Sequence, residues 1–81
     1  MQTSEIIDRV YRILRTELNL EDDKQIQLNS HIMNDLGADS LGSVEIIMCM
    51  EDEFGITIPD EKIDEIIYVE DVVRVIGELV G

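Results

Sequence analysis

The sequence predicts an all-α protein, a small four-helix bundle with three longer helices, one short helix and a long loop between the first two helices. Apolar residues recur at steps of three and four along most of the chain, which is the spacing of one helix face. Sequence signals for β-hairpin turns are missing, although the many Val and Ile residues favour strands intrinsically. The length of 81 residues corresponds to one small domain, residues 1–81, with a modest core and no deep enzyme cleft.

The first helix is expected from Thr3 to Leu18, with Thr3 or Ser4 able to cap its start. Its apolar face is formed by Ile6, Ile7, Val10, Tyr11, Leu14 and Leu18. The helical period then breaks over residues 19–39, which are rich in Asn, Asp and Gly and are predicted to form a loop. Four apolar residues are expected to anchor this loop to the core: Ile26, Leu28, Ile32 and Leu36. A loop of this length in a small domain is more often functional than filler.

The second helix is expected from Ser40 to Phe54, because Gly55 can supply the left-handed turn that commonly ends a helix. Residues 55–59 then form an extended link. A brief third helix is predicted over Asp60 to Ile66, although it is too short to be stable alone. The last helix is expected from about Glu70 to Leu79. Its apolar contacts are Val72, Val73, Val75, Ile76, Leu79 and Val80.

The charge of the chain is strongly acidic, with 19 Asp and Glu against 6 Lys and Arg and a formal charge of −13. This balance repels nucleic acid and anionic membrane surfaces and favours partners with basic patches. The charge is also polarised, because no Lys or Arg occurs between Lys24 and Lys62. The most acidic part of the molecule is therefore expected around the second helix.

Cys49 is the single cysteine, so an internal disulfide is impossible and a reducing compartment fits. The sequence contains no cluster of Cys and His residues with the spacing of a metal site. The N-terminal segment interleaves charges with apolar residues and resembles neither a signal peptide nor a membrane span. We therefore expect a cytoplasmic protein that binds no metal and is not an integral membrane protein.

The second helix carries apolar residues on two opposite faces. At roughly 100° per residue, one arc is wide enough to face the core. That arc is formed by Ile46, Ile47, Met50 and Phe54. Nearly opposite, a small apolar patch ringed by acids indicates docking to a basic surface with an apolar centre, against the alternative of ordinary scattered surface residues. The patch and its acids are Leu41, Val44, Met48, Glu45, Glu51 and Asp52.

Ser40 stands where the second helix begins and admits three interpretations. Asp39 or Ser40 could simply cap the helix. A nucleophilic serine needs a base, and the only histidine, His31, lies nine residues upstream in the loop without a nucleophile elbow, so we interpret it as an ordinary surface residue. A phosphate ester on Ser40 would be favoured by the positive end of the helix dipole. Cap and attachment point both remain open on position alone.

Three segments of the chain closely resemble the acyl carrier proteins of fatty acid synthesis. They are DLGADSL at residues 35–41, Val44-Glu45, and EDEFGITIPDE at residues 51–61. The resemblance extends over essentially the whole chain. It implies that Ser40 carries a covalent 4′-phosphopantetheine arm within an attachment motif that includes Asp39 and Leu41. A separate phosphopantetheinyl transferase would install the arm from coenzyme A.

The resemblance implies a non-catalytic carrier for type II fatty acid biosynthesis, in which partner enzymes act in turn on an acyl thioester. Its partners would be the malonyl transferase, ketoacyl synthases, reductases, dehydratase and acyltransferases, reached through their basic patches by a monomeric carrier. The family's partner-facing positions correspond to the apolar patch and acids named above. Carriers of this family shelter the acyl chain between helices. Candidate acyl-pocket or core positions are Ile46, Met50, Phe54, Ile66 and Val72.

Several residues depart from the family pattern. Gly42 stands where a polar residue is common, and glycine in a helix costs up to about 1 kcal/mol relative to Ala. His31-Ile32 replaces a common Ser-Phe pair, Tyr68 replaces a frequent capping Thr before the last helix, and Cys49 replaces a small residue. Cys49 is interpreted as a packing residue. These departures leave two alternatives open: a carrier dedicated to lipid A, polyketide or aminoacyl chemistry, and an acidic interaction module in which Ser40 only caps the helix.

Overall fold

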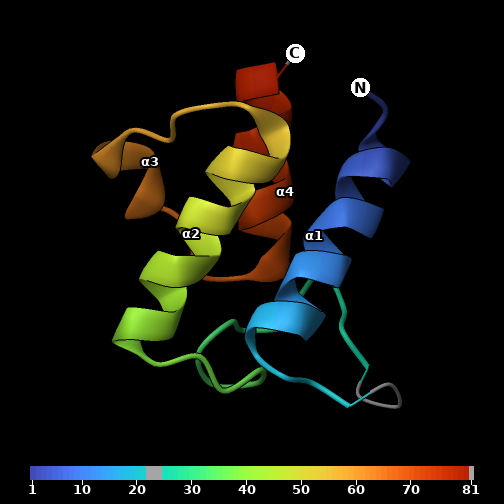
Figure 1. The fold of residues 1–81 in the computed structure, drawn as a ribbon, viewed down its shortest axis with the longest axis vertical. Coiled ribbons are helices and arrows are strands. Elements are labelled where there is room, and N and C mark those ends of the chain that lie inside the picture. The colour runs from blue at the N-terminus through green and yellow to red at the C-terminus, as the bar shows by residue number, and fades with distance from the viewer. Residues whose placement is uncertain (22–24, 81) are drawn as a thin grey trace.

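Four helices and the long loop make up the computed structural model, which describes residues 1–21 and 25–80 (Figure 1). The helices are α1 Thr3–Glu17, α2 Ser40–Phe54, α3 Asp60–Ile63 and α4 Val69–Val80. The all-α prediction with three longer helices and one short helix is therefore confirmed. Residues 22–24 of the expected loop and Gly81 lie outside the described residues.

Helices α1, α2 and α4 form the bundle, and α1 contacts both of the others. The short α3 lies at the side of α2 and α4, away from α1 (Figure 1). The start of α1 and the end of α4 lie at one end of the molecule, whereas α2 begins at the opposite end beside the loop (Figure 1). The residues around Ser40 are therefore remote from the first and last turns of the bundle.

The core follows the apolar faces that the helical spacing predicts, except that Leu79, an expected contact of the last helix, is exposed. In α1 the buried residues are Ile6, Val10, Ile13 and Leu14, of which only Ile13 was not predicted. In α2 they are Ile46, Ile47 and Met50, and in α4 they are Val69, Val72, Val73, Val75 and Ile76. The described part of the chain contains no helix that is long and apolar enough to cross a membrane.

One helix cap and one helix end differ clearly from the prediction. Gln2 occupies the N-cap of α1 without a side-chain cap bond, so the expected capping by Thr3 or Ser4 is wrong. The predicted extension of α3 to Ile66 is also wrong, because the chain tightens after Ile63 into bonds between residues three apart. The N–H of Ile66 donates to the carbonyl of Ile63 at 3.0 Å, in such a turn.

Three of the four expected loop anchors are buried, namely Ile26, Ile32 and Leu36. The prediction is wrong for Leu28, whose side chain is 39% exposed. Its backbone makes the contact instead, because the Leu28 carbonyl accepts the N–H of Glu70 at 2.8 Å. The loop is thus tied to α4 by main-chain bonds as well as by apolar side chains.

The start of α4 does not need the capping Thr that Tyr68 replaces. Free N–H groups in the first turn of a helix require acceptors. The N–H of Val69 donates to the Ser30 carbonyl at 3.0 Å in the loop. In addition, Asp71 Oδ2 accepts the N–H groups of Tyr68 at 2.9 Å and Ile67 at 3.1 Å. This return bond from the third helical position is one half of a capping box.

Asp71 therefore links helix stability to pH. Burial opposes its charged form, but the hydrogen bonds from Tyr68 and Ile67 and the Arg74 guanidinium outweigh burial and lower the pKa of Asp71. Because the folded pKa lies below the unfolded value of about 3.9, the stabilisation is present above that pH and is lost as pH falls through the folded pKa.

We expect Asp71→Ala to lower the free energy of unfolding by about 1–2 kcal/mol at pH 7. The difference from wild type should shrink toward pH 3. Urea unfolding at both pH values measures it, with Glu70→Ala, an exposed neighbour of the same charge, as control. Equal losses in the two variants would contradict a capping role for Asp71.

Candidate functional site

Asp39 caps α2, and Ser40 is the first residue of the helix. Asp39 Oδ1 accepts the N–H of Gly42 at 2.6 Å. The hydroxyl of Ser43 donates to the Asp39 carbonyl at 3.0 Å. The predicted start of α2 is confirmed, and the capping role considered for either Asp39 or Ser40 falls to Asp39. Ser40 itself is exposed at the end of the helix.

Gly42 does not delay the start of α2, because the helix begins two residues before it. A Cβ atom at Gly42 would lie 3.0 Å from Asp39 Oδ1, closer than most real contacts. The glycine therefore leaves room for the short bond between its own N–H and the capping carboxylate. The departure from the family pattern at Gly42 thus has a local packing reason.

The loop immediately before this site is held by His31. Its Nδ1 atom accepts the N–H groups of Met33 at 3.2 Å and Asn34 at 3.0 Å. Its own N–H donates to Asp35 Oδ2 at 2.7 Å. The His31 ring also meets the Tyr68 ring edge-on, with 5.4 Å between centroids, beside an antiparallel bridge between the two residues. The expectation of an ordinary surface histidine is wrong, since the ring caps the turn that leads to α2.

We expect His31→Ala to lower the free energy of unfolding by about 1 kcal/mol, because two backbone N–H groups lose their acceptor. His31→Ser, which restores a side-chain oxygen, should recover most of this loss. Urea unfolding of both variants measures the effect, and faster amide exchange at Met33 and Asn34 in His31→Ala would locate it. If the Ala and Ser variants were equally stable, the capping role would be contradicted.

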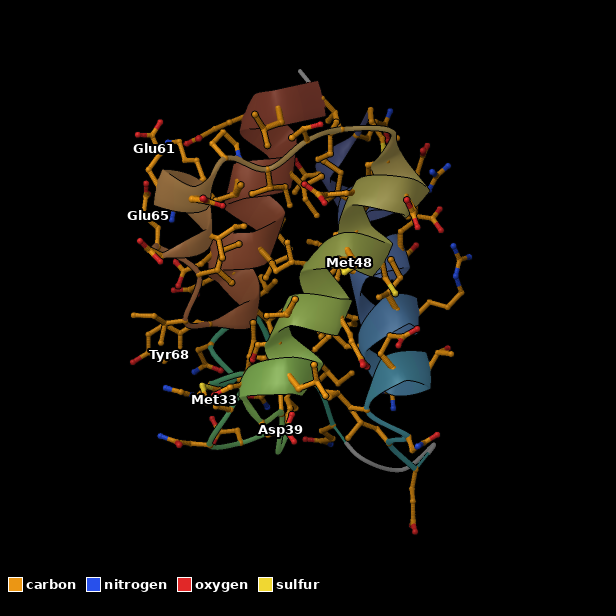
Figure 2. The ribbon with its side chains drawn as sticks, turned by 60° about the vertical axis from the view of Figure 1, so that its left-hand side comes forward. Met33, Asp39, Met48, Glu61, Glu65 and Tyr68 are labelled. Atoms are coloured by element: carbon orange, nitrogen blue, oxygen red, sulfur yellow. The ribbon has the colours of Figure 1, made fainter. Side chains whose placement is uncertain are left out.

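The second apolar face of α2 is exposed as the spacing predicts. Leu41, Val44 and Met48 are 67%, 55% and 59% exposed. Met48 projects outward from the middle of α2, and Asp39 lies below the start of the helix (Figure 2). Among the flanking acids Glu45 and Asp52 are exposed, whereas Glu51 is half-buried.

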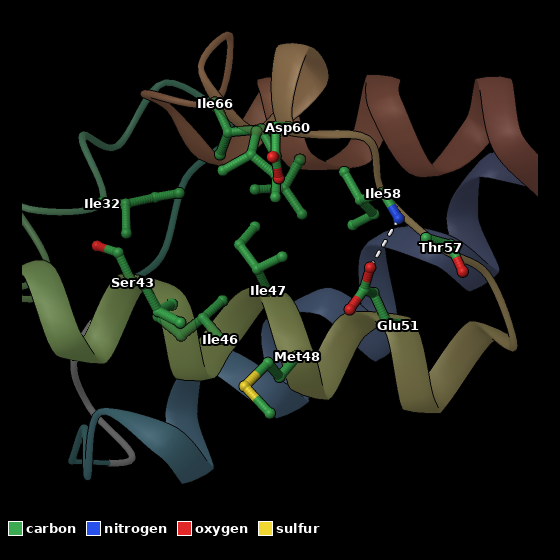
Figure 3. Close-up of a pocket in the computed structure, with 13 residues that line it drawn as sticks. Ile32, Ser43, Ile46, Ile47, Met48, Glu51, Thr57, Ile58, Asp60 and Ile66 are labelled. Carbon is green, nitrogen blue, oxygen red and sulfur yellow. Dashed lines mark hydrogen bonds between the residues drawn. The ribbon is translucent and has the colours of Figure 1, made fainter.

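An apolar cavity of about 380 Å³ lies between α2, α3 and α4 (Figure 3). Its size is within the range of roughly 300–1,000 Å³ that is typical of small-molecule sites. The lining residues are Ile32, Ser43, Val44, Ile46, Ile47, Met48, Glu51, Thr57, Ile58, Asp60, Ile63, Ile66 and Val72. Val44 and Met48 belong to both the cavity and the exposed patch, so the patch borders the cavity mouth.

The five candidate acyl-pocket or core residues divide into two groups. Ile46, Ile66 and Val72 line the cavity. Met50 is fully buried in the core, and it is not among the lining residues. Phe54 packs against the core with the Arg9 guanidinium 5.8 Å from its ring centroid. The cavity thus occupies one side of α2 and the packed core another.

The sequence is similar to that of an acyl carrier protein from Zymomonas mobilis subsp. mobilis, with 40% identity over 75 residues. The match covers 93% of this chain and 95% of the relative. Residues 8–76 also match the phosphopantetheine attachment site family. The chain belongs to the acyl carrier protein family. The prosthetic group of this carrier is therefore phosphopantetheine, as predicted.

The start of α2 fits such a group. Attachment of phosphopantetheine to a chain through a phosphodiester requires an accessible hydroxyl, and Ser40 is exposed. The N-terminal end of a helix favours the negative charge of a phosphodiester. By contrast, the Ser43 hydroxyl donates to the Asp39 carbonyl, and Ser30 is buried with its Oγ accepting the N–H of Gln27. When bound, the group supplies a thiol that holds an acyl group as a thioester.

Cys49 is a second thiol in the loaded carrier, on a different face of α2. Burial, a hydrogen bond to Glu17 and the nearby charges of Glu17, Asp52 and Glu45 all raise the pKa of Cys49. A raised pKa keeps the thiol protonated and poorly nucleophilic. This agrees with the interpretation of Cys49 as a packing residue.

Within residues 1–21 and 25–80, no group of three His, Cys, Asp or Glu side chains could hold a metal ion.

Proposed function

We propose that this carrier bears growing acyl chains as thioesters in type II fatty acid biosynthesis, on a 4′-phosphopantetheine arm attached to Ser40. The observation that carries the proposal is the position of Ser40. It is an exposed first-turn residue of α2, in the Asp39-Ser40-Leu41 motif, beside the end of an apolar cavity that Ser43 lines. The hydroxyl can reach solvent while the chain that it tethers can return to an apolar environment.

The roles of the surrounding residues follow from their contacts. Asp39 fixes the start of α2 and so the position of Ser40, and it is not itself among the residues that line the cavity. The chain serves as anchor and shelter, and its partner enzymes perform the chemistry. A phosphopantetheinyl transferase would supply the base that activates the Ser40 hydroxyl.

The cavity is the proposed shelter for the acyl chain. Its wall is formed mainly by Ile, Val and Met side chains from three helices, the loop and the link before α3. Burial of an apolar chain against such a wall contributes about 0.8 kcal/mol per CH₂. A loaded acyl group should therefore stabilise the fold by an amount that grows with chain length until the cavity is filled.

Partner enzymes are proposed to dock on the exposed patch of Leu41, Val44 and Met48 and on the acids beside it. Glu45 is exposed one turn from Leu41. We expect Glu45→Lys to weaken binding to a ketoacyl synthase or transferase by about tenfold, with a larger effect at low salt because exposed charges are screened. Affinity measured at two ionic strengths checks this. Glu61→Lys, an exposed acid on α3, is the matched control, and equal effects of both would contradict a localised docking surface.

The second candidate function is that of a carrier dedicated to another pathway. It is supported by Gly42 and His31, where the sequence departs from the pattern of the fatty acid synthesis carriers. The acyl groups on the carrier purified from its own cells separate the two functions. A range of saturated and β-hydroxyacyl chains is expected for fatty acid synthesis. A single specialised acyl or aminoacyl group would overturn the general role and support the dedicated one.

A further inference from the structure

Glu51 accepts hydrogen bonds from three backbone N–H groups that follow the end of α2. Its carbonyl accepts the N–H of Gly55, and also that of Ile56 at 3.1 Å. Its carboxylate accepts the N–H of Ile58 at 2.7 Å. Gly55 has a positive φ of 64°, so the chain reverses there and brings Ile58 back alongside the helix. One residue thus closes the whole link between α2 and the turn before α3.

The Glu51 side chain is half-buried and lines the cavity. Figure 3 shows its carboxylate directed at Ile58 across the end of the cavity, opposite the end where Ser43 lies. Ser43, Ile47 and Glu51 are four residues apart and so form one row on the helix surface. The row spans about 12 Å at 1.5 Å per residue. Asp52, the next residue, is exposed.

The hydrogen bond between Glu51 and Ile58 affects the cavity, because Ile58 forms part of the cavity wall. Its side chain is 3% exposed and lines the cavity wall. Thr57, beside it in the link, lines the same wall. The hydrogen bond is partly buried. A backbone N–H that is shielded from water and loses its acceptor is unfavourable, so removal of the carboxylate should drive the link outward until water reaches the N–H of Ile58.

We propose that Glu51 is a positioning residue that holds the closed end of the acyl cavity and thereby limits the length of chain that this carrier shelters. This role rests on the proposed function. It separates Glu51 from Glu45 and Asp52, with which the sequence grouped it as a partner contact. The carboxylate acts on the link and, through Ile58, on the cavity wall.

The first experiment measures amide hydrogen exchange at Ile58 in the carrier without its arm. Glu51→Ala should exchange at least tenfold faster than wild type at Ile58, because the acceptor is gone. Glu51→Gln keeps an acceptor oxygen at the same reach and should stay within about threefold of wild type. Asp52→Ala removes the same charge from the next residue and should leave Ile58 unchanged. Wild-type exchange in Glu51→Ala would overturn the proposal.

The second experiment loads the same variants with saturated acyl groups of increasing length and measures Tm for each. In wild type, the gain in Tm should rise with length and then stop. In Glu51→Ala the longest chain that still adds stability should be longer, whereas Glu51→Gln and Asp52→Ala should match wild type. The same limit in Glu51→Ala as in wild type would overturn the proposal.

A further variant covers the case in which Glu51→Ala does not fold. Glu51→Asp keeps the charge but is one methylene shorter, so it should show the fast Ile58 exchange and the longer limit. The two experiments also separate the proposals. If wild type takes up no arm, or if no acyl length changes its Tm, the proposed function fails. If wild type shows a length limit that no Glu51 variant moves, only the role of Glu51 fails.

Discussion

Ser40→Ala is expected to take up no phosphopantetheine when it is incubated with coenzyme A and a broad-specificity phosphopantetheinyl transferase. Wild type should gain the mass of one arm under the same conditions, as read by intact mass spectrometry. The physical reason is that the Ala side chain has no hydroxyl to form the phosphodiester. The loss should be complete, because Asp39-Ser40-Leu41 is the single Asp-Ser-Leu motif of the sequence, and Ser43 and Ser30 already use their hydroxyl groups in local hydrogen bonds.

The fold of Ser40→Ala should remain intact, which separates loss of the anchor from loss of structure. Asp39, not Ser40, accepts the capping hydrogen bond, so the stability of the variant should stay within about 0.5 kcal/mol of wild type. Ser43→Ala is the matched control in the same helix and should load fully. Loading of Ser40→Ala would place the arm on another residue. Failure of wild type to load, while a control carrier loads, would favour the acidic interaction module.

Both bounds of α2 were predicted to the residue, because local sequence signals set both of its ends. Asp39 and Gly55 act within a few residues of α2, so its bounds could be inferred without knowledge of the fold. The end of α3 could not, because the tight turn after Ile63 leads into a long-range bond that helical spacing does not reveal. The Ile67 carbonyl accepts the N–H of Ile32 from the loop, while the N–H of Ile67 donates to the nearby Asp71 carboxylate.

The candidate site divides in the same way. The exposure of Leu41, Val44 and Met48 followed from their angular position on α2. The inward turn of Glu51 was missed, since charge suggested a surface role and its partner lies seven residues later in the link. One signal was available, because Glu51 is one turn after Ile47 on the core-facing side. The capping role of His31 could not be predicted from the sequence, since histidine is not a common capping residue.

The face of α2 that packs against α1 should carry most of the stability of the apo carrier. Met50 is fully buried and does not line the cavity, so Met50→Ala removes contacts on every side. We expect a loss of about 2–5 kcal/mol in the free energy of unfolding. A small domain has about 5–15 kcal/mol in total, so the variant should be close to unfolding at physiological temperature.

Ile47→Ala should cost less, about 2 kcal/mol, because Ile47 lines the cavity and part of its surroundings is already empty. Met48→Ala, a change of the same residue type at an exposed position, should stay within about 0.5 kcal/mol of wild type. Urea unfolding of the three apo variants orders these effects. A loss in Ile47→Ala as large as that in Met50→Ala would mean that the cavity is filled by side-chain motion in solution. The division of α2 into a structural side and a side that shelters the acyl chain would then be wrong. The expected order instead leaves the carrier free to open and fill one side of α2 while α1 packs against the other.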